Sequence, residues 1–125
     1  SNDYINFLKT GDIRFCKDGK FGFIHMLSYT SNFDLQEQIL QISDINLKDI
    51  FDCTALIIEC KNNDTNLIKK ILEYNPDINL QNLVQDTALI IACENNNIEI
   101  INRVIVILVI VLHTVLLYYE FLLIY

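Results

Sequence analysis

Hydrophobic residues in the middle of the chain fall into short blocks with helical spacing, and polar triplets separate the blocks. An apolar run follows Thr54 and ends at residues 62–64, and a second run follows Thr87 and ends at residues 95–97. Between these runs, residues 65–74 place Leu and Ile at helical spacing, which predicts a helix with one buried face. The pattern therefore predicts a unit of helix, turn, helix and loop.

The ends of the predicted helices carry suitable residues. Thr54 and Thr87 are good N-caps, because a threonine hydroxyl accepts a hydrogen bond from a free N–H of the first helical turn. Asn75 tolerates the left-handed conformation that ends a helix, and Pro76 prevents the helix from continuing.

The same unit occurs twice in the sequence. A shift of 33 residues aligns Thr54–Cys60 with Thr87–Cys93, identical at six of seven positions, and Asp44–Leu47 with Asp77–Leu80, identical at all four. Units of this length stack on one another, because a single unit cannot bury its apolar face alone. We therefore predict an all-α solenoid of helix-turn-helix units.

These blocks resemble the signature of the ankyrin-repeat family. Its T-P-L-H-x-A-A segment corresponds to Thr54–Cys60 and Thr87–Cys93, and its L-L-x-x-G-A-D-V-N segment corresponds to Ile71–Asn79. The Asn- and Ile-rich composition is similar to that of ankyrin proteins encoded by large DNA viruses of amoebae. The resemblance implies an ankyrin-repeat solenoid with short hairpin loops, with about two regular repeats plus degenerate ends. It also implies a non-catalytic module that recognises proteins through its hairpin tips and inner helix face.

The sequence departs from the family pattern at several positions. Ile57 and Ile90 replace the signature histidine, so the imidazole hydrogen bonds that join neighbouring loops are not expected. Asp52 and Gln85 stand where the family usually has glycine at the hairpin, so looser turns are expected. 

Glu59 occupies a position where a small alanine usually packs between helices. A carboxylate buried there would be costly unless it reached solvent or a cation such as Lys61. The remaining signature positions are expected to be buried between helices: Leu56, Leu89, Cys60 and Cys93.

Towards the N-terminus the repeat continues in a degenerate form. Its phase places Asp18–Gly19 at a hairpin tip and Phe21–Ile24 on the T-P-L-H positions, with Leu35, Ile39 and Leu40 on the inner face of a second helix. The predicted organisation is an N-terminal segment (1–17), a degenerate capping repeat (18–46), an ankyrin repeat (47–79), an incomplete ankyrin repeat (80–105) and an apolar C-terminal segment (106–125).

The repeat pattern is lost after Arg103. From Val104 to Tyr125 only His113, Thr114 and Glu120 interrupt an apolar run, which as a helix would extend about 33 Å, enough to cross a bilayer's hydrocarbon core. Three interpretations are open: a membrane anchor at Val104–Tyr125, a final helix pair buried in the solenoid, and a degenerate or frame-shifted end of a longer array.

Charge and composition exclude several classes of function. The 125 residues include 9 Lys and Arg against 16 Asp and Glu, a net charge of -7, which has the wrong sign for nucleic-acid binding. The four cysteines show no metal-ligand spacing, so we expect reduced thiols, no metal, no cofactor and a cytoplasmic location, with membrane association as the alternative. His25 and His113 are expected at core or interface positions. A Cys16–His25 pair lacks a third orienting group, so no catalytic residue is expected.

The candidate binding site lies at the two hairpin tips, where apolar residues replace the usual exposed polar ones. The predicted protein-binding residues are Ile50, Phe51, Asp52, Leu83, Val84 and Gln85. The apolar ones among them form a small stripe, and a polar rim of Asp49, Asp52, Gln85 and Asp86 surrounds it. The tips could instead fold inward against one another. Residues 44–99 carry ten acidic and four basic side chains, which favours a basic protein partner. A cytosolic ankyrin scaffold tethered to a membrane by the C-terminal segment is the second hypothesis.

Overall fold

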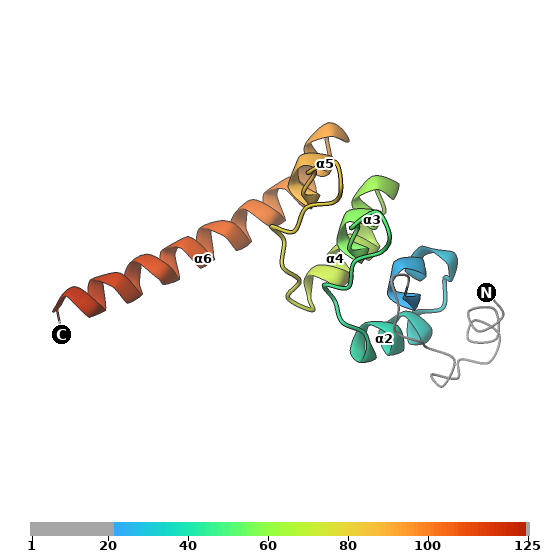
Figure 1. Ribbon diagram of the computed structural model, residues 1–125, viewed down its shortest axis with the longest axis horizontal. Coiled ribbons are helices and arrows are strands. Elements are labelled where there is room, and N and C mark those ends of the chain that lie inside the picture. Colours follow the sequence, from blue (N-terminus) through green and yellow to red (C-terminus); the bar gives the residue numbers. More distant parts are fainter. Residues whose placement is uncertain (1–21, 125) are drawn as a thin grey trace.

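The computed structural model describes residues 22–124, and these residues form helices and loops without strands. The elements are the 3-10 helix η2 (Phe23–Tyr29) and the α-helices α2 (Phe33–Ile42), α3 (Ala55–Asn62), α4 (Thr65–Leu72), α5 (Ala88–Glu94) and α6 (Ile98–Ile124). They form successive helix pairs stacked side by side, and α6 extends far beyond the stack (Figure 1). The predicted all-α solenoid is confirmed.

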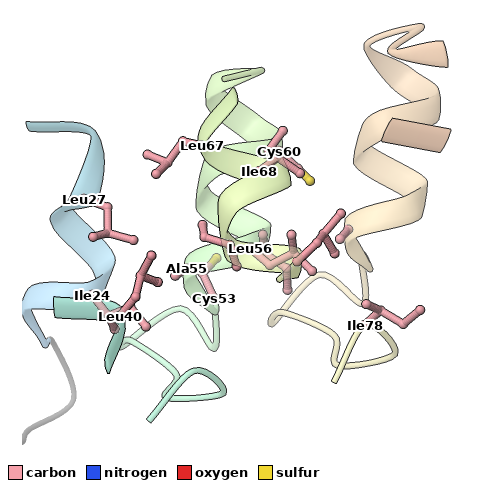
Figure 2. Close-up of a cluster of buried hydrophobic side chains, with 14 of the residues drawn as sticks. Ile24, Leu27, Leu40, Cys53, Ala55, Leu56, Cys60, Leu67, Ile68 and Ile78 are labelled. Carbon is pink, nitrogen blue, oxygen red and sulfur yellow. The ribbon is translucent and has the colours of Figure 1, made fainter. Parts of the chain in front are cut away.

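The core of the protein lies between successive helix pairs. Helix α3 packs against η2 on one side and against α5 on the other, and α4 packs against α6. Aliphatic side chains from all three pairs fill the space between them (Figure 2). The most deeply buried are Ile24, Leu27, Ile39, Leu56, Ile57, Ile68, Ile71, Ile100 and Val104. Each repeat is therefore stabilised by its neighbours, as expected of a solenoid.

The predicted capping residues are confirmed, although α4 ends at Leu72, two residues before the predicted end at Tyr74. The Thr54 hydroxyl accepts a hydrogen bond from the Ile57 N–H, and the Thr87 hydroxyl accepts one from the Ile90 N–H, both at 3.3 Å. Asn75 adopts the left-handed conformation, with φ 52°.

The polar triplets inside each repeat join one repeat to the next. The Asn97 amide donates to Asn63 Oδ1 at 2.8 Å and to Thr65 Oγ1 at 3.0 Å. The Asn95 amide donates to the Cys60 carbonyl, at the end of α3, at 2.8 Å. These asparagines thus supply hydrogen bonds at helix ends across the repeat boundary.

The first repeat is offset by one residue from its predicted phase. Gly22 is the N-cap of η2, so Gly22–His25 occupies the T-P-L-H positions and the predicted assignment of Phe21–Ile24 is wrong. His25 therefore stands at the signature histidine position, where it is buried as predicted. Its Nδ1 accepts from the Gly22 N–H at 2.9 Å, and its Nε2 lies 2.8 Å from the Leu47 carbonyl oxygen. One imidazole link between loops is present after all.

The offset has a simple cause in loop length. Asn32 and Asp64 are the N-caps of α2 and α4, and the loop segments that follow these helices begin at Asp44 and Asp77. The stretch from Asn32 to Asp44 is one residue shorter than the stretch from Asp64 to Asp77. The second helix itself is as predicted, and the three apolar side chains expected on its inner face are buried: Leu35, Ile39 and Leu40. The predictions for residues 1–17, Cys16 and Asp18–Gly19 lie outside the described residues.

The last repeat is less covered than the sequence predicts. Ile57 in α3 is 1% exposed, whereas Ile90, at the same position of α5, is 41% exposed. Leu89 is only partly buried and Cys93 is exposed, so the prediction that both are buried is wrong. The reason is that α5 packs against α3, while among the described residues no further helix pair covers the opposite side of α5 and α6.

Helix α6 continues through the point where the repeat would turn into a loop. It runs unbroken from Ile98 to Ile124, and residues 109–124 are all exposed. This segment is therefore not a buried helix pair. By length and composition α6 could cross a membrane.

Candidate functional site

The first hairpin tip, residues 48–53, is closed by its own backbone and by one side chain. The Asp49 N–H donates to the Cys53 carbonyl at 2.9 Å, and the Asp52 N–H donates to the Asp49 carbonyl at 3.0 Å. Asp49 Oδ1 accepts from the N–H groups of Phe51 and Cys53, each at 2.9 Å. Asp49 is buried and supports the turn, so its predicted place in an exposed rim is wrong.

The second tip, residues 81–86, repeats this arrangement with an amide. The Asn82 N–H donates to the Asp86 carbonyl at 3.1 Å, and the Gln85 N–H donates to the Asn82 carbonyl at 2.9 Å. Asn82 Oδ1 accepts from the N–H groups of Val84 and Asp86 at 3.1 and 3.0 Å. Asp and Asn serve equally here, because both offer a short side-chain oxygen to nearby backbone N–H groups.

Both tips contain a left-handed residue that is not glycine. The φ angle is 57° at Asp52 and 66° at Gln85. The turns are nevertheless closed by the hydrogen bonds described above, so the expectation of looser turns is wrong. The missing glycine is accommodated as local backbone strain.

The two tips are joined to each other. The Leu83 N–H donates to the Phe51 carbonyl at 3.1 Å. The Lys48 ammonium group donates to the Gln81 carbonyl at 3.0 Å. A partner would therefore meet a surface whose backbone is already ordered, which lowers the entropy cost of binding.

The apolar residues of the predicted site are exposed. We call the following four residues the tip patch: Ile50, Phe51, Leu83 and Val84. Their exposed fractions lie between 60% and 71%, so the alternative in which the tips fold inward is not what the structure has. Gln85 is exposed, and Asp52 and Asp86 are half-buried.

Sequence reasoning missed the residues that hold the tip patch in place. Asp49 and Asn82 occupy the same position in consecutive repeats, and both can accept hydrogen bonds from the backbone two residues ahead. That shared property is the signal that could have identified them. The role of His25 was hidden by the one-residue offset of the first repeat.

The most perturbed carboxyl group lies in the core and not at the tips. Glu59 is fully buried, and neither carboxylate oxygen has a hydrogen-bond partner. Burial raises the pKa of Glu59 to about 7, the Asp64 carboxylate adds to the rise, and the nearby Ser28 and Asn62 side chains oppose it. The Lys61 ammonium group lies 3.5 Å from Cys53 Sγ, and no salt bridge joins it to Glu59 in the described part of the chain.

The described residues hold little that could serve chemistry. Burial raises the pKa of the Cys60 thiol to about 12, with the Glu59 carboxylate contributing, so this thiol is a poor nucleophile. Between residues 22 and 124 no cluster of three His, Cys, Asp or Glu side chains could hold a metal ion. The arrangement is suited to contact with another surface.

Comparison with known families agrees with this geometry. A family model for ankyrin repeats (3 copies) matches residues 24–106, well over half of the chain. No curated protein matches the chain. The matched residues begin inside η2 and end in the part of α6 that packs on the solenoid, so they coincide with the stacked helix pairs. The chain belongs to the ankyrin-repeat family.

Proposed function

We propose that this chain is a non-catalytic interaction module that binds a protein through the tip patch and the inner helix face beside it. Its ankyrin repeats place it among protein–protein interaction modules. The observation that carries the finer proposal is a pair of hydrogen-bonded hairpins that expose four apolar side chains to solvent.

The tip patch has the properties of a binding surface. Exposed aliphatic and aromatic side chains gather on two neighbouring turns, and half-buried acidic residues lie beside them. Interfaces of this kind are usually dominated by a few aromatic or aliphatic anchors. Phe51 is the aromatic member of the patch and is therefore the expected main anchor.

Charge indicates which partners can approach. Residues 44–99 carry six more acidic than basic side chains, which favours a basic peptide or protein surface. Complementary charge mainly accelerates association and is screened within about 8 Å at physiological ionic strength. Raising the salt concentration should therefore slow association and leave dissociation nearly unchanged.

A peptide library displayed on phage tests this proposal without a known partner. Selection on the full chain should enrich basic sequences with apolar side chains. Phe51→Asp and Val84→Asp should each weaken binding of the selected peptides by at least about tenfold. Circular dichroism should show unchanged helix content, because both side chains are exposed.

The matched control is Tyr29→Asp, which also changes an exposed residue, but at the end of η2 and away from the tips. It should leave peptide binding unchanged. Peptides that bind all three variants as well as the unchanged chain would exclude the tip patch as the site. Unfolding of Phe51→Asp would show that the residue supports the fold instead.

A membrane-tethered scaffold is the second candidate, and one observation favours it. Helix α6 is long and apolar enough to span a bilayer, and little of its apolar part is buried. The exposed residues 109–124 extend only about 24 Å, so a span of about 30 Å would have to begin near Val104, directly beside the solenoid. Arg103 before the apolar run would favour a cytosolic solenoid.

Carbonate extraction of membranes from cells that express the full chain tests this second candidate. An anchored chain should stay in the membrane pellet, and Leu116→Arg should release it, because an arginine in the middle of a span is costly. Val84→Arg is the control, because it introduces the same charge at the tip patch. Full solubility of the unchanged chain without detergent would exclude the anchor.

A further inference from the structure

The outer side of the last helix pair has the residues of an interior surface. In α3 and α4 the side chains that face the next repeat are almost completely buried: Ile57, Cys60, Ile68 and Leu72. We call the corresponding residues of α5 and α6 the open end face: Ile90, Cys93, Ile101 and Ile105. Two of these are 41% and 44% exposed (Ile90 and Ile105), Cys93 is exposed and Ile101 is partly buried.

The open end face carries no charge, although the chain as a whole is strongly acidic. Terminal repeats of a solenoid normally present a polar outer side to water. One repeat earlier, the same residue positions are covered by an apolar helix pair, namely α5 and α6. The face therefore fits another helix pair of the same size and polarity.

The open end face continues along α6 beyond the solenoid. Apolar residues follow it at alternating intervals of four and three: Ile101, Ile105, Leu108, Leu112, Val115 and Tyr119. This spacing forms one continuous stripe on a helix and is the spacing of a two-stranded coiled coil. We call it the α6 stripe.

The charged residues of α6 that lie beside the solenoid, Glu99 and Arg103, are on the opposite side of the helix from the α6 stripe. At 100° per residue, Glu99 and Arg103 fall on one side of the helix, roughly half a turn from the stripe, and Glu120 lies roughly a quarter turn from it. Glu99 forms a salt bridge with Lys69 of α4 at 2.8 Å, so the charged side of α6 is the side near the preceding repeat. The stripe consequently points away from α4, and only two of its members, Ile101 and Leu108, pack partly against the core.

We propose that a second copy of this chain covers the open end face, with the two α6 helices parallel and paired along the α6 stripe. A helix pair in the same chain does not cover the face within the described residues, because α6 runs on as one helix to Ile124. A two-fold axis parallel to α6 brings the same uncharged surface of each copy together, which is the commonest symmetry of homodimers. The pairing goes beyond the protein-binding function proposed above, and its variants lie in the α6 stripe and not in the tip patch.

Sedimentation of the full chain over a hundredfold range of concentration tests the pairing. The expected result is a monomer–dimer equilibrium. Ile105→Glu places a charge in the α6 stripe and should weaken association by at least about tenfold, because two like charges would meet at the axis. Val106→Glu is the matched control: the neighbouring residue is 55% exposed on the same helix but lies outside the stripe, and it should leave association unchanged.

Cys93 gives a second measurement, because it lies in the open end face and is exposed in the single chain. Its alkylation, followed by peptide mass spectrometry, should slow as protein concentration rises, and Ile105→Glu should abolish that protection. A chain that stays monomeric, that grows into open-ended assemblies, or that responds equally to Ile105→Glu and Val106→Glu would overturn the proposal. Cys93 alkylation that is independent of concentration would overturn it too.

Discussion

The repeat of α3 and α4 and the repeat of α5 and α6 have nearly the same signature sequence but bury it differently. Thr54–Cys60 and Thr87–Cys93 begin with the same cap and form the same inner helix. Ile57 is buried, whereas its counterpart Ile90 is 41% exposed. In a solenoid the burial of a residue is therefore a property of the neighbouring repeat as much as of the residue itself.

The largest effect expected from this comparison is on stability. Ile57→Ala should lower the free energy of unfolding by about 2–5 kcal/mol, because it opens a cavity between two repeats. At protein concentrations where the chain is monomeric, Ile90→Ala makes the same chemical change at a position that is 41% exposed and should cost less than about 1 kcal/mol. Urea unfolding followed by circular dichroism measures both. Equal losses would mean that α5 is covered as completely as α3.

A second difference between the two repeats is the buried acid. Glu59 occupies the position that Ala92 holds in the next repeat, and both are buried. The rise of its pKa from 4.5 to about 7 means that the folded chain binds the proton more tightly than the unfolded chain. Stability is therefore highest below pH 4.5 as far as this group is concerned, falls as pH rises to 7, and is lower by about 3 kcal/mol above that range.

Urea unfolding between pH 5 and pH 8 checks this dependence, and Glu59→Gln supplies the control. The variant should remove most of the fall in stability, because a neutral amide does not titrate. Glu37 and Glu99 have lowered pKa values, so their contribution is lost only as pH falls below about 4.5, outside this interval. A chain whose stability rises from pH 5 to pH 8 would contradict the buried position of Glu59.

The first repeat differs from both others by its histidine. His25→Leu should cost about 1–3 kcal/mol, because the Gly22 N–H and the Leu47 carbonyl both lose a partner in or near the core. His113→Leu changes an exposed residue of α6 and should leave the unfolding free energy unchanged. If both substitutions are neutral, the imidazole does not join the two loops.

The smallest expected effect is at the hairpin turns. Gln85→Gly should raise the unfolding free energy by about 1 kcal/mol, because glycine adopts a left-handed backbone without a steric penalty. Asp52→Gly should gain less, since aspartate tolerates this conformation better than glutamine. Thermal unfolding of the two variants in parallel ranks the two turns. A loss of stability at Gln85→Gly would mean that its side chain contributes more than the strain removes.

The sequence predicted the local features of each repeat correctly, but it did not predict the burial of residues that contact a neighbouring repeat. The Thr caps, the Asn75 turn and the apolar spacing of α4 are local, so the pattern predicted them correctly. The exposure of Cys93 depends on whether another repeat follows, which no pattern inside the repeat encodes. The one-residue offset of the first repeat was also missed. The first repeat was aligned with the 33-residue spacing of the later repeats, although the stretch between them is one residue shorter.

The same division holds for the candidate site. The sequence left two alternatives open for the tip patch, exposed side chains or tips folded inward, and the structure has the exposed one, because apolar residues on a short turn have little protein to pack against. The buried position of Asp49 was not predicted, because an acidic residue on a loop usually faces solvent, and only its hydrogen bonds to Phe51 and Cys53 turn it inward. Binding at this surface depends on the residues of the partner as well as on those of this chain, so this sequence alone does not determine it.

Because α6 is one unbroken helix that extends beyond the solenoid, small movements of the last repeat are amplified at its far end. Because the first turns of α6 are buried in the solenoid at Ile100 and Val104, a rotation of the last repeat carries the exposed rod of the helix with it. The rod extends about 24 Å beyond its support, so a rotation of the last repeat by about 10° would swing the far end by about 4 Å. A spectroscopic label near Leu123 would therefore report small rearrangements in the repeat stack as displacements large enough to measure.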